Sequence, residues 1–235
     1  LARDFIEKVT HPLAPQYLRF YFGAKLSSNT GDLDLNFSDF CNRVNTTLAN
    51  NIGNLHHRTS VFCERFFDAR VPDAPWDPAL EKEVETIGAQ IEAHMDNVEY
   101  KAAIEKIHLL GNRGNKYYQD TRPWDLVKKD PGDAAAVMVT CFNLVKSIAV
   151  FLKPFVPSIV GRIEEQLGLT LSWDDYHFSL RNVPIHPSKK LVEPLEREAF
   201  DALLGTMQGG PDAKPSKPDK TSKKQTGGDN LIDIQ

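Results

Sequence analysis

The sequence predicts an all-α protein: an antiparallel helix bundle with an irregular C-terminal return and a disordered linker. Apolar residues recur at spacings of three and four over several long stretches, which is the period of an amphipathic helix. Proline and capping side chains stand at the ends of these stretches, where helices begin and end. With 235 residues, 41% of them hydrophobic, the chain is long enough to bury a sizeable core.

The N-terminal part predicts two helices. Residues 13–26 carry apolar side chains on nearly every side, as in a helix buried among others. Asn36 is a predicted N-cap, with Asp39 in an acidic first turn, for one continuous helix that runs to Phe66. The predicted buried stripe of this helix has members three, four or seven positions apart: Phe37, Phe40, Val44, Leu48, Ile52, Leu55, Phe62 and Phe66.

The middle of the chain predicts four further helices. Asp77 followed by Pro78 marks the start of a helix that runs to about Asn97. The next helix covers residues 98–119 and stops before a Thr-Arg-Pro-Trp turn, since the residue before a proline avoids helical geometry. Two more helices, separated by a proline-containing break, complete the predicted bundle: 131–152 and 158–167.

Composition divides the chain into four predicted parts. Residues 1–170 form the helix bundle, and residues 171–208 form an irregular return segment with a terminal helix. Residues 209–229 are rich in lysine, proline and glycine and too poor in apolar residues to offset chain entropy, so they predict a disordered linker. Residues 230–235 turn apolar again, which indicates the truncated start of another domain.

Charge and cysteine content restrict the class of protein. The formal net charge of −4 argues against nucleic-acid binding by bulk positive charge, so any such binding must be local. Three cysteines within helical patterns, Cys41, Cys63 and Cys141, indicate reduced thiols and a cytoplasmic location. No apolar run approaches the about 18 residues that span a bilayer, so no membrane partner is expected.

Metal ligands and catalytic motifs are not found in the sequence. His56 and His57 are neighbours on a predicted helix, about 100° apart, so they cannot bind one ion as a pair four residues apart would. We interpret them as solvated or half-buried side chains. Without metal-ligand spacing, a Cys-x-x-Cys pair or a phosphate-binding glycine motif, the sequence predicts neither a metal site nor a catalytic residue in this chain.

The polar face of the long predicted helix is a candidate binding site. Thr47, Asn51, Asn54 and Arg58 are spaced four, three and four residues apart and so line one stripe. Asn54 and Arg58 lie one turn apart, about 6 Å, which sets a fork of donors beside an amide that both donates and accepts. This pair suits the edge of a nucleic-acid base, although a solvated helix face would have the same spacing.

Trp124 is a second candidate because it follows Pro123 in a predicted loop, outside any periodic apolar stripe. An exposed indole beside a donor pair can hold an unstacked base, with stacking worth about 1–3 kcal/mol per base. The alternative is that this tryptophan belongs to the core.

Three stretches of the sequence resemble one protein family. They are YLRFYFGAKLSS, DLDLNFSDFCNRVNTTLANNIGNLHHR and NKYYQDTRPW, and in this order they resemble the C-terminal helical domain of bacterial methionyl-tRNA synthetases. The resemblance implies a class I synthetase anticodon-binding domain that packs against a catalytic Rossmann domain and recognises the CAU anticodon of methionine tRNAs. By residue matching it implies that Asn54, Arg58 and Trp124 contact anticodon bases and that Pro123 shapes the loop.

The same resemblance implies what lies outside this chain. Methionine activation with ATP and Mg²⁺, and any zinc, would belong to a catalytic domain before Leu1, so the chain alone would have no activity. Residues 230–235 resemble the approach to an OB-fold tRNA-binding domain, through which many members form homodimers.

Two alternatives stay open at this stage. One is a helical protein-interaction module without nucleic-acid binding, which the negative net charge favours. The other is the anticodon domain of a different class I synthetase.

Overall fold

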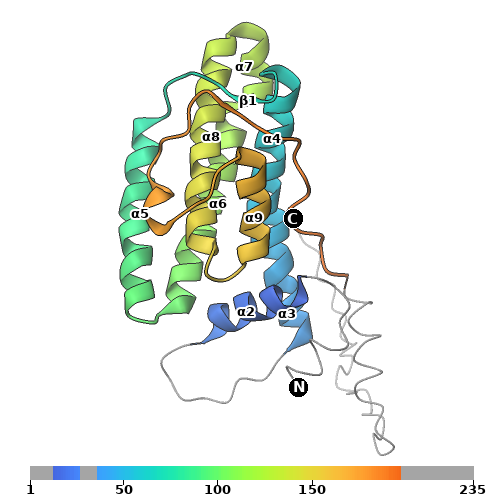
Figure 1. Ribbon diagram of the computed structural model, residues 1–235, viewed down its shortest axis with the longest axis vertical. Coiled ribbons are helices and arrows are strands. Elements are labelled where there is room, and N and C mark those ends of the chain that lie inside the picture. The colour runs from blue at the N-terminus through green and yellow to red at the C-terminus, as the bar shows by residue number, and fades with distance from the viewer. Residues whose placement is uncertain (1–12, 27–35, 197–235) are drawn as a thin grey trace, which may run out of the picture.

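Helices supply almost all of the regular structure, as predicted (Figure 1). A computed structural model describes residues 13–26 and 36–196 of the chain. The predicted terminal helix, the linker 209–229 and residues 230–235 lie outside the described residues. The described elements are α2 (Ala14–Lys25), α3 (Phe37–Arg43), η1 (Val44–Gly53), α4 (Asn54–Phe66), β1 (Arg70–Val71), α5 (Pro78–Asp96), α6 (Tyr100–Thr121), α7 (Pro123–Lys129), α8 (Pro131–Leu152), α9 (Pro157–Leu167), η2 (Trp173–Tyr176) and β2 (Val183–Pro184).

Helix α8 is the centre of the bundle, and α4, α5, α6, α7 and α9 pack around it. Asp130 caps its N-terminus by accepting hydrogen bonds from the backbone N–H groups of Gly132 and Asp133. Contrary to the sequence expectation, this helix is long and apolar enough to cross a membrane. Because 94% of its most apolar window is buried inside the bundle, its composition is that of a core helix.

The predicted continuous helix from Asn36 to Phe66 contains a π-helical segment, η1, between two α-helices. A π-helix has i→i+5 hydrogen bonds and therefore turns less per residue than an α-helix. Six of the eight residues of the predicted stripe are buried, whereas Phe37 is half-buried and Phe66 is exposed. Asn51, which was predicted on the polar face, is buried, with its side chain hydrogen-bonded to His108 of α6. Gly53 ends the segment, where a Cβ would lie 2.9 Å from the carbonyl oxygen of Leu48.

The return segment after α9 is held on the bundle by buried amides. Asn143 of α8 donates to the carbonyl oxygens of Val139 and Leu180 and accepts from the N–H groups of Ser179 and Leu180. Further along, the side chain of Asn45 hydrogen-bonds both the N–H and the carbonyl oxygen of Leu195.

The return segment, which was predicted to be irregular, contains the short strand β2. Strand β1, which was not predicted, pairs with it in antiparallel fashion, Val71 opposite Val183. Two residues of β1 are too few to produce an alternating pattern, so periodicity could not detect the strand.

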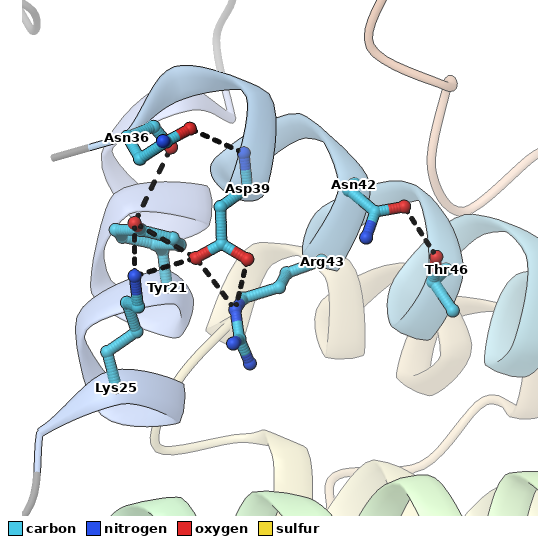
Figure 2. Close-up of polar contacts among 7 residues, drawn as sticks. All are labelled: Tyr21, Lys25, Asn36, Asp39, Asn42, Arg43 and Thr46. Atoms are coloured by element: carbon cyan, nitrogen blue, oxygen red, sulfur yellow. Dashed lines mark hydrogen bonds and ion pairs between the residues drawn. The ribbon is translucent and has the colours of Figure 1, made fainter. Parts of the chain in front are cut away.

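Helices α2 and α3 are joined by a polar cluster around Asp39 (Figure 2). The carboxylate of Asp39 lies 2.8 Å from the ammonium group of Lys25 and 2.9 Å from Nε of Arg43, and it accepts a hydrogen bond from the hydroxyl of Tyr21. As predicted, Asn36 caps α3, with its side chain accepting from the N–H of Asp39. Burial acts to raise the pKa of Asp39, but the bonds from Lys25 and Arg43 outweigh it and hold the pKa below its ordinary value.

Replacing Asp39 with alanine should destabilise the protein by about 1–2 kcal/mol, because one carboxylate joins cations on two helices. The free energy of unfolding, measured by urea denaturation, checks this. Asp120→Ala is the matched control: it removes a more exposed ion pair with Lys116 within one helix and should cost under about 0.5 kcal/mol. Equal effects of the two substitutions would contradict the role assigned to Asp39.

Candidate nucleic-acid interface

Trp124 lies in the first turn of a helix, not in a loop as the sequence predicted. Helix α6 ends at Thr121, Arg122 follows with a left-handed backbone (φ 49°), and Pro123 is the first residue of α7. A proline suits this position because its fixed φ is helical and its missing N–H would have no partner there. Pro123 is buried, whereas Trp124 is half-buried with its ring centroid 6.0 Å from that of Tyr118.

Arg58 lies against the same tyrosine. Its guanidinium is 4.2 Å from the ring centroid of Tyr118, a cation–π contact, and its Nη2 donates to Oε1 of Gln119. Burial raises the pKa of Tyr118 to about 12, with Arg58 opposing the shift, so the phenol stays neutral. Tyr118 and Gln119 therefore hold a long, flexible side chain in one orientation.

These residues surround a cavity of about 450 Å³ between α4 and the α6–α7 corner, here called the aromatic pocket. Its walls combine flat rings with cations, which is the chemistry that holds an unstacked base and the adjoining phosphate. It is lined by His57, Arg58, Val61, Phe62, Arg65, Phe66, Tyr118, Trp124 and Lys128.

Asn54 lies beside a second, more open hollow of about 510 Å³ between η1, α4 and α6, here called the amide groove. Asn54 is exposed, and its Nδ2 donates to Oδ1 of Asn115 at 3.4 Å. The lining of the groove is rich in amides: Thr46, Asn50, Asn51, Asn54, Arg58, His108, Asn112, Asn115, Lys116 and Gln119. Arg58 lines both hollows, so the two adjoin.

The structure brings Asn54, Arg58 and Trp124 to one surface, around the aromatic pocket and the amide groove. Sequence reasoning missed the residues of α6 that hold them, above all Asn115 and Gln119. Their spacing of four residues, equal to that of Asn54 and Arg58, was a usable signal, because such pairs share one helix face.

The two adjacent histidines have different surroundings. His57 is exposed, but His56 is 2% exposed and hydrogen-bonds Oε1 of Gln166 at 2.6 Å, so its interpretation as solvated or half-buried is wrong. Burial lowers the pKa of His56 to about 4, so its ring is neutral at pH 7. Within residues 13–26 and 36–196, no three His, Cys, Asp or Glu side chains gather in a way that could hold a metal ion.

Comparisons with known proteins agree with the fold. Residues 71–187 match the family described as the anticodon binding domain of methionyl tRNA ligase, and residues 4–60 match the class I tRNA synthetase (M) family. The crystal structure of apo Mycobacterium tuberculosis methionyl-tRNA synthetase is similar, with a TM-score of 0.71 and 20% identity over 78% of this chain. A structure of that enzyme bound by methionyl-adenylate gives a TM-score of 0.68 and 21% identity over 75% of this chain.

The bundle is thus the anticodon-binding helical domain of a class I aminoacyl-tRNA synthetase. Within that class, the chain belongs to the methionyl-tRNA synthetase family. It spans 39% and 37% of the lengths of the two solved chains to which it is similar.

Proposed function

We propose that this chain recognises the CAU anticodon of methionine tRNAs, as part of a ligase that attaches methionine to tRNA. The observation that supports this most directly is the arrangement of Arg58, stacked on Tyr118, between the half-buried Trp124 and the exposed Asn54. In the complete enzyme, ATP with Mg²⁺, and any zinc, would bind in a catalytic Rossmann domain that packs against this bundle. A cytoplasmic location and a homodimer formed by a further C-terminal domain belong to the same proposal.

In this proposal one anticodon base enters the aromatic pocket and stacks on the indole of Trp124. Arg122, with its left-handed backbone, and Pro123 set the turn between α6 and α7, and this turn places the indole of Trp124 in the lining of the pocket. Arg58 and Asn54 hydrogen-bond base edges, with about 1–3 kcal/mol of discrimination for each good pairing. Arg58 is suited to this task because Tyr118 and Gln119 already hold it, so little side-chain entropy is lost on binding.

The net charge of the chain is negative, but cationic side chains line the two hollows where the anticodon loop is proposed to bind. Arg65 and Lys128 line the aromatic pocket and Lys116 lines the amide groove, so cations gather where the phosphates of the loop would lie. Each phosphate neutralised on a single strand contributes about −0.7 to the slope of log affinity against log salt. A module that binds only a protein through this face would lack that steep slope, and so salt dependence separates the two hypotheses.

Trp124→Ala should lower affinity for a CAU anticodon stem-loop at least about five-fold, because the loss of stacking removes about 1–3 kcal/mol. The measurement is a fluorescence-anisotropy titration of labelled stem-loop at one stated salt concentration, with a second loop whose first anticodon base is changed to guanine. Trp173→Ala is the control, since Trp173 packs on Phe151 and lies outside both hollows. Unchanged binding by Trp124→Ala, or equal binding of the two loops by the unaltered chain, would refute the proposal.

A further inference from the structure

Three amide side chains form a chain of hydrogen bonds from the interior of the bundle to Asn54. Asn51 donates through Nδ2 to the carbonyl oxygen of His108 at 3.0 Å. Asn115 donates through Nδ2 to Oδ1 of Asn51 at 2.9 Å, and Asn54 donates through Nδ2 to Oδ1 of Asn115. All three amides thus donate inward, and Asn51 and Asn115 each accept from the next amide outward.

The direction of this chain is set by backbone carbonyl groups, which can only accept hydrogen bonds. The carbonyl of His108 requires that the NH₂ group of Asn51 face inward, which leaves Oδ1 of Asn51 to accept. Nδ2 of Asn115 also faces the carbonyl oxygens of Asn51 and Gly111, both 3.0 Å away, so its orientation is fixed twice. Reversing either amide would set oxygen against oxygen in a partly enclosed site, at the cost of unpaired polar groups.

The ring of His108 supports the same direction. Its Nδ1 lies 3.1 Å from Nδ2 of Asn51, and this contact is a hydrogen bond only when Nδ1 is an unprotonated acceptor. Burial lowers the pKa of His108, which favours that neutral ring. Asn51 therefore meets two acceptors, one for each hydrogen of its NH₂ group.

We propose that this relay of Asn51 and Asn115 fixes the side-chain amide of Asn54 with its oxygen directed to the ligand, as an acceptor for the exocyclic amino group of an anticodon base. Asn115 is then a positioning residue that determines specificity without touching RNA. A freely rotating Asn54 amide would accept from an amino group or donate to a carbonyl equally well, and would discriminate poorly between them.

The chemistry of the partner follows from this arrangement. Cytosine and adenine carry exocyclic amino groups, whereas uracil and hypoxanthine carry carbonyl oxygens at the same positions. Arg58, whose Nη2 is bound to Gln119, supplies only donors beside Asn54. An acceptor next to donors is the complement of the base-pairing edge of cytosine, and the acceptor alone is also the complement of the amino group of adenine.

This inference rests on the proposed function and is tested with three stem-loops. One carries CAU, one has uracil in place of the cytosine, and one has hypoxanthine in place of the adenine. The unaltered chain should bind the CAU loop at least about five-fold more tightly than one of the two altered loops. The altered loop that binds more weakly identifies the base that Asn54 contacts.

Two substitutions disrupt the relay at positions that do not contact the RNA in this proposal. Asn115→Ala removes its middle member, and Gly111→Ala brings a Cβ within 2.6 Å of Oδ1 of Asn51, which must then move. Both should reduce the CAU preference to less than two-fold while salt-dependent binding of all three loops remains. Gly161→Ala is the control, because a Cβ there meets nothing within 4 Å, and it should keep the preference.

A rescue variant separates positioning from a merely structural role. In Asn115→Ala/Asn54→Asp the carboxylate presents acceptors in every orientation and needs no relay, so the preference for an amino group should return. Retained preference in Asn115→Ala and Gly111→Ala would overturn the relay. So would a chain that binds CAU more tightly than the loop with guanine as its first base but discriminates against neither the uracil nor the hypoxanthine loop, because the anticodon would then be recognised, as the proposed function requires, without an amino group being read.

Discussion

Asn143→Leu should destabilise the protein by about 3 kcal/mol or more and release the return segment from α8. The substitution preserves the size of a fully buried side chain but leaves the N–H groups of Ser179 and Leu180 and the carbonyl of Leu180 without their partners. Each buried backbone group left unpaired costs about 1–3 kcal/mol. The expected result is a lower midpoint of urea unfolding and faster proteolytic cleavage between residues 177 and 186.

Release of this segment should also alter the surface beside Asn54. Lys190, Leu191 and Pro194 of the return segment line a cavity of about 420 Å³ that Asn54 and His57 also line. Asn97→Leu is the control, because that exposed amide makes one bond to the end of its own helix and should cost under about 1 kcal/mol. If both leucine variants unfold at the same urea concentration, Asn143 does not hold the segment.

The helices could be predicted from the sequence because their signals are local. The bounds of α8, residues 131–152, were predicted correctly from Pro131 at its start and the proline-containing break after it. The π-helical segment could not be predicted, since Leu48, Ile52 and Leu55, which are buried in it and just after it, have the spacing of an α-helix. Helix α7 was missed because its seven residues were interpreted as a loop after Pro123.

The candidate site was predictable to a similar extent. Asn54 and Arg58 were singled out by spacing on one helix, which sequence records directly. The residues that hydrogen-bond them, Asn115 and Gln119, could not be found in this way. Each lies 61 positions after its partner in the chain, and only the packing of α6 on α4 brings the partners into contact. Gly111 carried a weaker signal: a glycine within a helix indicates a close approach, here of Asn51.

Stability should fall as the pH is lowered from about 6.5 to 4, by about 3 kcal/mol from His56 alone. In the folded chain burial lowers the pKa of His56 to about 4, against 6.5 as its ordinary value. Between these values the unfolded chain binds a proton that the folded chain does not, so acid favours unfolding. The stabilisation is fully present above pH 6.5 and is lost progressively as the pH approaches 4.

The variant His56→Gln isolates this effect, because glutamine can donate to Oε1 of Gln166 as His56 does but cannot take up a proton. Other groups also titrate in this range, His108 with its lowered pKa among them, and they affect both proteins alike. The free energy of unfolding should therefore fall more steeply with acid in the unaltered chain than in the variant. Parallel curves would mean that the buried ring accepts a proton without cost.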